Sequence, residues 1–431
     1  MSLRVIRYPD ASTLAEGLAT LRGSAVDMTG MVLTVGIVQP VDPLSWLIAQ
    51  PAGHRLYWAD RSGSVCAGWG FADVRADLTG ELCGRYFGGM AFDPDAPTDD
   101  AWAPLGRQRF FLPLLRLESS EEGLTLTLDC RSGTDLSGVT AEATPPGDAI
   151  IGAITAQAPD LAGWSGGIRS ATAAFDSGAM RKVVLARQTT VALHAPVDPF
   201  ALLARLQQPG GFVFGFEVTA GHAFVGCSPE RLFRREGRTL STEALAGTRR
   251  RGDSLHDDQR LAAELLASTK ERAEHHHVVE AIEADLAPLC TALSRDAHPQ
   301  IRQLSQVQHL HTPFTGTLSS TTSDTDLLAA MHPTPAVCGR PTDRARAFIA
   351  RAEPFDRGWY AGPVGWVDHD AAEFAVGIRS VLVLGDSLRF CTGAGIVEGS
   401  QAEAEWAELG AKSSRLTGLL QPPVQQQAVG S

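Results

Sequence analysis

Cysteines are few and scattered in this sequence, and long hydrophobic runs are missing. The seven cysteines lie between Cys66 and Cys391 and form no C-x-x-C pair, which indicates reduced thiols and argues against a disulfide framework. No stretch of about 18 apolar residues occurs, so we expect no membrane span. The opening residues, MSLRVIRYPDAS, lack the apolar core of a signal peptide. We therefore expect a cytoplasmic protein.

Positive charge is also in short supply. Lysine and arginine number 37 against 49 aspartates and glutamates, a net charge of −12. This balance argues against sequence-independent nucleic-acid binding, which relies on basic patches. An anionic substrate would require cationic groups concentrated at one site. With 431 residues, 44% of them hydrophobic, the chain can bury a core without disulfides or a structural metal.

The chain divides by its pattern of apolar runs and turns. Residues 1–150 alternate short apolar runs with turn clusters, which predicts a strand-rich N-terminal part. TPPGDAIIGA (144–153) has turn chemistry and could mark a junction. Residues 151–420 then form the second region, and the tail 421–431 is expected to be disordered.

Strands and helices of the second region come in blocks. This favours an α+β sandwich over a doubly wound sheet. We predict helices at 164–180, 256–289 and 401–420, and strands at 181–193, 211–218, 222–226, 231–235, 239–245, 361–368, 374–384 and 388–391.

Two carboxylate pairs lie in predicted helices. Glu271 and Glu274 are three residues apart, as are Glu405 and Glu408, with Lys412 four residues further on. Such spacing puts the side chains on one helical face. For one pair alone, a solvated surface is the commoner interpretation. Carboxylates from two elements nevertheless suit Mg²⁺, which prefers hard oxygen ligands.

The segment CTGAGIVEGS, with Gly393 and Gly395, leads from a predicted strand into the last helix. Glycines permit close backbone approach to a ligand, and exposed amides there could hold a carboxylate. Most such turns, however, are purely structural. Ser400 and Glu403 fit a capping box at the start of the helix.

Three further features have competing interpretations. The adjacent residues His275, His276 and His277 point about 100° apart on a helix and should not chelate one ion. Lys182 lies in an apolar strand and could act as a base, or it could lie at a strand edge. Glu230, in CSPERLFRR, could instead form a structural ion pair with a nearby arginine.

Ten motifs in order along residues 182–416 resemble those of the chorismate-utilising enzymes: KVVLAR, GCSPE, EALAGTRRRG, STKERAEH, VQHLHTPFTG, HPTPAVCG, EPFDRGWYAGPVGW, GIRS, GAGIV and EWAELGAK. The upstream segments FGGMAFDP and RQRFFLPLLRLE look like isochorismate synthases of the menaquinone type. The resemblance implies the large αββα-type sandwich of the anthranilate synthase component I-like family. The expected small-molecule substrate is chorismate.

The resemblance also implies roles for individual residues. Lys182 matches the general base that activates water for attack at ring carbon C2, and Glu230 matches the acid that protonates the departing C4 hydroxyl. As a base, Lys182 needs a pKa well below about 10.4. The implied Mg²⁺ ligands are Glu274 and Glu408, with Glu271 and Glu405 around the ion. The implied substrate contacts are Gly247, Thr248, His309, Ala336, Tyr360, Arg379, Gly393, Gly395 and Lys412.

Residues at a few positions indicate the branch of the family. Ala246 replaces the lysine nucleophile of the aminodeoxychorismate branch, and HHVVEAIEAD lacks the Arg-Asn-Asp of the anthranilate branch. Water is thus the expected nucleophile, and no amidotransferase subunit is expected. Ala336 in HPTPAVCG favours isochorismate synthase over salicylate synthase, whose members tend to have threonine there.

Two alternatives stay open: a salicylate synthase, and a non-catalytic chorismate-binding protein. The downstream use of the product, in menaquinone, siderophore or salicylate biosynthesis, is open as well. Gln401-Ala402 and Val337 depart from the usual family residues.

Overall fold

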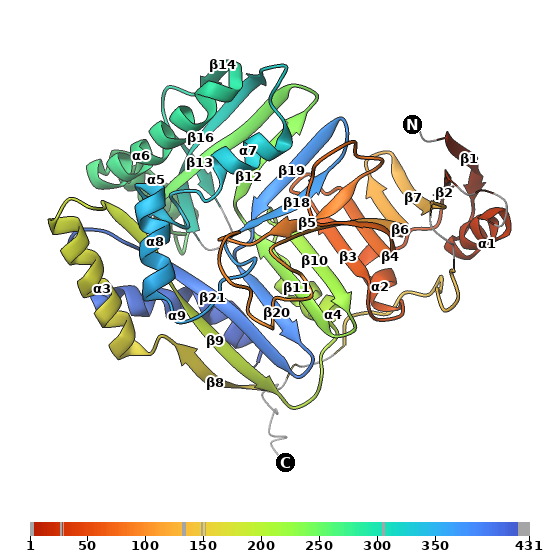
Figure 1. Ribbon diagram of the computed structural model, residues 1–431, viewed down its shortest axis with the longest axis horizontal. Helices are drawn as coiled ribbons and strands as arrows, with labels where there is room; N and C mark the ends of the chain where they lie inside the picture. The colour runs from red at the N-terminus through yellow and green to blue at the C-terminus, as the bar shows by residue number, and fades with distance from the viewer. Residues whose placement is uncertain are drawn as a thin grey trace.

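Two hydrogen-bonded sheets share the long strand β6 (Gln108–Ser120) in the computed structural model, which describes residues 4–25, 28, 30–131, 135–147, 150, 152–303 and 307–420 (Figure 1). One edge of β6 pairs with β4 over residues 110–119. Its opposite edge pairs with β7 and, over residues 108–111, with β5. The two sheets diverge from this strand.

The first sheet follows one path of neighbouring strands from β6 towards each end of the molecule. Its order is β1 (Arg4–Ala11), β2 (Met31–Ile37), β7 (Gly123–Asp129), β6, β4 (Val65–Arg75), β3 (Arg55–Ala59), β10 (Phe212–Thr219), β11 (His222–Ser228), β20 (Ser380–Leu384), β21 (Ser387–Ile396) and β9 (Lys182–Leu193). The short β17 (Gly339–Arg340) and β8 (Gly152–Ala158) both pair with β9.

The second sheet continues from the first residues of β6. Its order is β5 (Tyr86–Met90), β18 (Pro363–Val367), β19 (Ala371–Val376), β12 (Arg231–Glu236), β13 (Thr239–Arg250) and β16 (Val307–Leu318), with β14 (Cys290–Arg295) and β15 (Gln300–Gln303) on the far edge of β16.

An aromatic core joins the facing sides of the two sheets. Phe214 and Phe216 of β10 and Phe224 of β11 come from the first sheet, and they cluster with Phe87 and Val364 of the second. All are almost fully buried. Burying such side chains is worth about 1.5–3 kcal/mol each, so this layer is a main source of stability.

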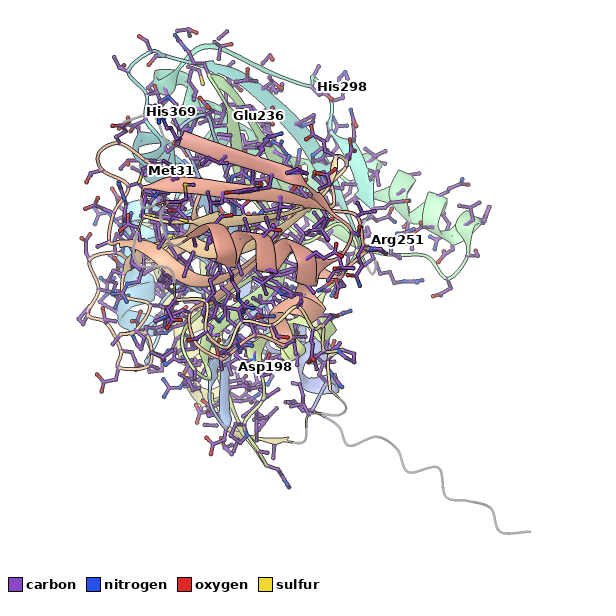
Figure 2. All side chains as sticks on the ribbon, turned by 90° about the vertical axis from the view of Figure 1, so that its right-hand side faces the viewer. Met31, Asp198, Glu236, Arg251, His298 and His369 are labelled. Carbon is purple, nitrogen blue, oxygen red and sulfur yellow. The ribbon has the colours of Figure 1, made fainter. Side chains whose placement is uncertain are left out.

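Helices cover the outer faces. On the first sheet, α1 (Leu14–Ser24) lies over β1, β2 and β7 (Figure 2), and α2 (Pro43–Ile48) and α4 (Pro199–Leu206) follow along the same core. The helices α3 (Leu161–Asp176) and α9 (Ala402–Gly418) lie beside β9 and β21, and α8 (Thr342–Ala352) contacts β9 and β17. On the second sheet, α5 (Leu255–Ala267) and α6 (Thr269–Leu286) pack on β13 and β16, with α7 (Asp324–Met331) against α6. The predicted α+β sandwich is confirmed.

The N-terminal strands are built into both sheets. β3 pairs with β10 in the first sheet, and β5 pairs with β18 in the second. Residues 4–131 therefore share their hydrogen bonding and their core with the later strands. A division near residue 150 stays a prediction, because part of the 144–153 segment and the tail 421–431 lie outside the described residues.

Two elements that the sequence predicts as continuous are each divided in the structure. The expected helix 256–289 is two helices, because Ser268 takes an extended backbone, ends α5 and caps α6 by accepting from the Glu271 amide. The expected strand 374–384 is two strands, because the chain leaves the second sheet after β19 and enters the first at β20.

The predicted capping box is also wrong. Gln401, not Ser400, stands at the N-cap of α9. The Ser400 hydroxyl accepts instead from the Val397 amide, at 3.2 Å, and so stabilises the turn before the helix.

Candidate active site

Two neighbouring crossings between the sheets place two of the expected residues. Glu230 lies where the chain passes from β11 to β12, and Arg379 lies where it passes from β19 to β20. The Val376 amide donates to the Glu230 carbonyl at 3.0 Å, and the Cys227 amide donates to the Arg379 carbonyl at 3.2 Å. Arg379 has φ 54°, a left-handed conformation that is costly for a non-glycine residue. The crossings are thus held side by side.

Lys182 opens β9, and its side chain is 19% exposed. Its Nζ lies 3.8 Å from a carboxylate oxygen of Glu274. Burial lowers the pKa of the Lys182 ammonium below its usual value. The charge of Lys412 acts in the same direction, whereas those of Glu274 and Glu230 oppose it. A lowered pKa favours the free amine over the ammonium, which fits the predicted role of base.

Glycine leaves room for this lysine. On the neighbouring strand β21, a Cβ at Gly395 would lie 3.3 Å from Lys182 Cε. That distance is tighter than ordinary van der Waals contact, so a side chain there would have to displace the lysine.

Glu230 shows the opposite shift. Burial raises the pKa of its carboxyl to about 7. The negative charge of Glu243 adds to the shift, whereas the positive charges of Lys182 and Arg61 oppose it. A substantial fraction of Glu230 is therefore protonated near neutral pH, which suits a general acid. Glu230, Thr334 and Ala336 line one cavity. Ala336, the residue used above to separate isochorismate synthases from salicylate synthases, therefore lies close to the predicted acid.

The carboxylate pairs lie on two helices near these groups. Glu271 accepts from the Thr248 amide at 3.2 Å, and Glu408 pairs with Lys412 at 2.6 Å. Burial raises the pKa of Glu405, and the charge of Glu408 adds to this, while Lys270 of α6 opposes it. The first turns of α6 and α9 therefore interact electrostatically.

No group of three or more His, Cys, Asp or Glu side chains lies close enough to hold a metal ion within the ranges that the structure describes. The lysines instead accompany the carboxylates, with Lys182 near Glu274 and Lys412 beside Glu408. In donor chemistry, carboxylates from two helices fit Mg²⁺. The four-glutamate site stays a prediction.

The expected substrate wall contains a β-bulge. Gly247 has φ 76° and interrupts the register between β13 and β16. A Cβ there would lie 3.3 Å from a carboxylate oxygen of Glu271. After the bulge, the Thr248 hydroxyl lies 3.0 Å from His309 Nδ1 across the two strands. Burial lowers the pKa of His309 to about 4, so its ring is neutral at physiological pH.

Cations expected to hold substrate carboxylates also lie together. Arg379 donates to the Lys412 carbonyl at 2.8 Å, and the Lys412 ammonium donates to the Gly393 carbonyl at 2.9 Å. A Cβ at Gly393 would lie 3.0 Å from the Tyr360 hydroxyl. Burial lowers the pKa of the Arg379 guanidinium. Such a desolvated cation gains from an anionic ligand.

The histidine trio points in different directions. His275 is buried and lies 2.8 Å from the Thr312 hydroxyl. His276 and His277 are exposed and lie near Glu280. These separate environments explain the trio as helix packing on one side and solvent on the other.

Arg61 and Glu243 were not predicted as site residues. Both act on Glu230 through their charges. Glu243 alone had a signal, a carboxylate inside the apolar strand TLSTEAL, where charge is rarely buried unpaired. Arg61 lies in an unremarkable polar turn, so its position is visible only in the fold.

A desolvated lysine whose charge acts on a carboxyl of raised pKa is an arrangement typical of an acid–base enzyme. Residues 75–421 match the family of chorismate binding enzymes. The chain is 37% identical over 339 residues to isochorismate synthase MenF of Bacillus subtilis, covering 75% of this chain and 71% of that protein. This chain belongs to the chorismate binding enzyme family.

Two further matches extend over nearly the whole chain. The chain is 32% identical to isochorismate synthase MenF of Escherichia coli, and the match covers 95% of this chain and 99% of that protein. The solved structure of MenF, the menaquinone-specific isochorismate synthase from Escherichia coli, matches with a TM-score of 0.84 at 31% identity, covering 95% of this chain and 100% of that one. Among the described helices, none is long and apolar enough to cross a membrane.

Proposed function

We propose that this chain is an isochorismate synthase that isomerises chorismate to isochorismate. The observation that carries the proposal is the pairing of Lys182, whose pKa is lowered, with Glu230, whose pKa is raised to about 7. Acid–base catalysis requires one group that accepts a proton and one that donates it at the same pH. The similarity to isochorismate synthases over most of the chain supports the same reaction.

In the proposed mechanism, the Lys182 amine takes a proton from water while the water oxygen forms a bond to ring carbon C2. The ring double bonds shift, and the bond from C4 to its hydroxyl breaks. Glu230 supplies the proton with which that hydroxyl leaves as water. One water enters and one leaves, so the reaction is an isomerisation. Arg379, Lys412 and the backbone near Gly393 bind the substrate carboxylates.

Mg²⁺ is the proposed cofactor. Glu274 and Glu408 would hold it, with Glu271 and Glu405 around it. When bound, it supplies positive charge that offsets a substrate carboxylate in this acidic protein. Lys412 and Arg379 provide the remaining cationic surroundings.

The similar Escherichia coli structure is that of a menaquinone-specific isochorismate synthase, which supports menaquinone biosynthesis as the destination of the product. Siderophore and salicylate pathways are the alternatives. No amidotransferase partner is required, because water is the nucleophile in the proposed reaction. A cytoplasmic location stays a prediction.

The test is chromatography with mass detection of purified protein incubated with chorismate, with added Mg²⁺ or with a chelator. Magnesium-dependent isochorismate without salicylate supports the proposal. Salicylate together with pyruvate would move the protein to the salicylate synthase branch. If no product forms in either buffer, the catalytic proposal fails.

A further inference from the structure

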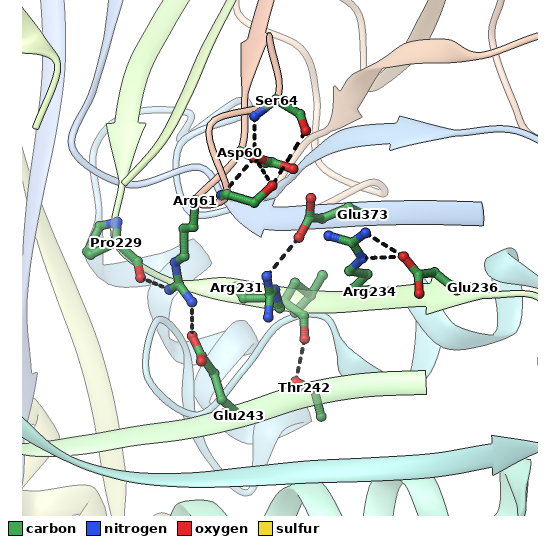
Figure 3. Close-up of polar contacts among 12 residues, drawn as sticks. Asp60, Arg61, Ser64, Pro229, Arg231, Arg234, Glu236, Thr242, Glu243 and Glu373 are labelled. Carbon is green, nitrogen blue, oxygen red and sulfur yellow. Dashed lines mark hydrogen bonds and ion pairs between the residues drawn. The ribbon is translucent and has the colours of Figure 1, made fainter. Parts of the chain in front are cut away.

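A buried polar network reaches Glu230 from the N-terminal part of the chain. Its outermost member is Arg61, at the turn between β3 and β4. Arg61 donates to the carbonyl of Pro229, the residue before Glu230, and to the Glu243 carboxylate at 2.6 Å (Figure 3). It lies outside residues 75–421, the part of the chain that matches the family. The family match therefore assigns nothing to it.

The turn that carries Arg61 is fixed by its own hydrogen bonds. The Asp60 carboxylate accepts from the Ser62 amide at 2.8 Å. It also accepts from the Ser64 amide at 2.9 Å (Figure 3). The Arg61 guanidinium lies 4.6 Å from the centre of the Phe212 ring, a cation–π contact that joins the turn to β10. The Arg61 side chain is only 8% exposed. The Arg61 guanidinium is thus a buried cation whose orientation is fixed by its contacts.

Glu243 is the centre of the network. On β13, its carboxylate also accepts from Arg302 of β15 at 2.9 Å and from His311 of β16 at 3.1 Å. Burial opposes its ionisation, but the His311 hydrogen bond and the nearby arginine charges lower the pKa of Glu243 to about 2. Glu243 is thus a permanent negative charge beside Glu230, and Arg61 contacts both this charge and the backbone next to Glu230.

We propose that Arg61 and Glu243 are positioning residues for Glu230: the Arg61 guanidinium holds the backbone at Pro229, and the Arg61–Glu243 pair sets the local charge that the Glu230 carboxyl experiences. Neither residue is assigned a contact with the reacting atoms. The catalytic meaning rests on the proposed function, because it assumes that Glu230 is the acid.

Several charged and polar groups surround Glu230. The charges of Glu243, Lys182 and Arg61 act on it directly, and Thr334 lines the same cavity as Glu230. Arg231 and Asp285 line the same cavity, while Arg302 and His311 act through Glu243. Removing the positive charge of Arg61 must make Glu230 harder to ionise. Removing the negative charge of Glu243 must make it easier to ionise. The two changes are therefore expected to have opposite effects.

The experiment compares Arg61→Met, Glu243→Gln and the double variant. In each, the titration of the Glu230 carboxyl is followed by carbon NMR on protein labelled at glutamate, with Glu230→Gln identifying the signal. We expect the pKa of Glu230 to rise by about one unit in Arg61→Met and to fall by a similar amount in Glu243→Gln. In the double variant, this pKa should lie between those of the two single variants. The alkaline limb of the kcat–pH profile should move with the titration.

The kinetic expectation is that kcat falls roughly tenfold to a hundredfold in Arg61→Met, because the acid loses its fixed position, while KM changes much less. Arg61→Lys keeps the charge and should recover the titration but only part of kcat. Arg235→Met is the matched control, because Arg235 also bonds a carboxylate, Asp324 at 2.6 Å, and a backbone carbonyl, but at the opposite end of β12.

Titrations that stay at the wild-type value in both single variants, or that move in the same direction, would overturn the proposal. A fall in melting temperature equal to that of Arg235→Met, without any titration shift, would give the network a purely structural role. The NMR titration does not depend on turnover. Wild-type protein that forms no isochorismate would sink the proposed function, while the charge relationship would still be decided.

Discussion

The Lys182 ammonium lies 3.8 Å from the Glu274 carboxylate and thereby links β9 to α6. This pair stabilises the charged form of the lysine, whereas burial stabilises the free amine. The balance between the two governs how much base exists at a given pH. Because burial is the larger influence, the amine is present at lower pH than for an exposed lysine.

Replacing Lys182 with methionine should remove the base while keeping an apolar stem of similar length. We expect kcat to fall at least about a hundredfold, the lower range for loss of a general base. Since the buried charge is also removed, the melting temperature should not fall. Isochorismate formation and thermal unfolding are the measurements. Arg181→Met, at the exposed neighbouring position, is the control and should keep full activity. Turnover retained in Lys182→Met would show that another group activates water.

The Glu230 carboxyl should set the alkaline side of the pH profile. With a pKa raised to about 7, mainly by burial, the acid is lost as the pH rises through neutrality. We expect kcat to decline above about pH 7, and Glu230→Gln to be nearly inactive throughout. A flat profile between pH 6 and about 9 would contradict the assignment.

The same shift predicts an effect on stability. In the folded protein, the pKa of Glu230 is raised from its usual 4.5 to about 7. The contribution of this carboxyl to the free energy of unfolding is therefore fully present below pH 4.5 and is lost as the pH rises through about 7. Glu230→Gln cannot ionise and should be more stable than wild type at pH 8. Denaturant unfolding at pH 5 and pH 8 checks this expectation. An equal difference at both pH values would contradict it.

Mg²⁺ binding can be measured separately from turnover by calorimetry. Glu274→Gln and Glu408→Gln should each weaken binding at least about tenfold, because each removes a charged oxygen ligand. Glu403→Gln, on the exposed first turn of α9, is the control and should bind as wild type does. If all these variants bind Mg²⁺ equally, the ion is held elsewhere.

The sequence could predict the sandwich and could nominate candidate site residues because motifs carry that information locally. The S-T-K-E segment at Ser268 also signalled a helix start, although we predicted one continuous helix there. The crossing at Arg379 had no comparable signal, because a break between two apolar strands depends on which sheet each strand joins. Arg61 and Pro229 are 168 residues apart, and no local pattern reports such a contact.

Arg55 and Glu217 provide a test of the core that does not involve the site. Arg55 Nε lies 2.5 Å from a Glu217 carboxylate oxygen, and both side chains are almost fully buried. Arg55→Met leaves that buried carboxylate without the Arg55 cation, so the free energy of unfolding should fall by about 3–5 kcal/mol. By contrast, Arg260→Met on the surface of α5 should cost less than about 1 kcal/mol because the Arg260 and Glu264 side chains are half exposed. Similar losses in both variants would show that Arg55 contributes no more than a surface pair.

Ala336 should control which product leaves the site. It lines the same cavity as Glu230, and the resemblance to the chorismate-utilising enzymes implies threonine at this position in the salicylate-forming branch. In Ala336→Thr, the larger side chain narrows the cavity and should prolong the stay of isochorismate, so that pyruvate elimination competes with release. We expect salicylate and pyruvate to appear beside isochorismate in the product analysis. Ala336→Val adds a similar volume without a hydroxyl, so it separates the effect of side-chain size from the effect of the threonine hydroxyl. If Ala336→Thr still yields isochorismate alone, this residue does not by itself separate the two branches.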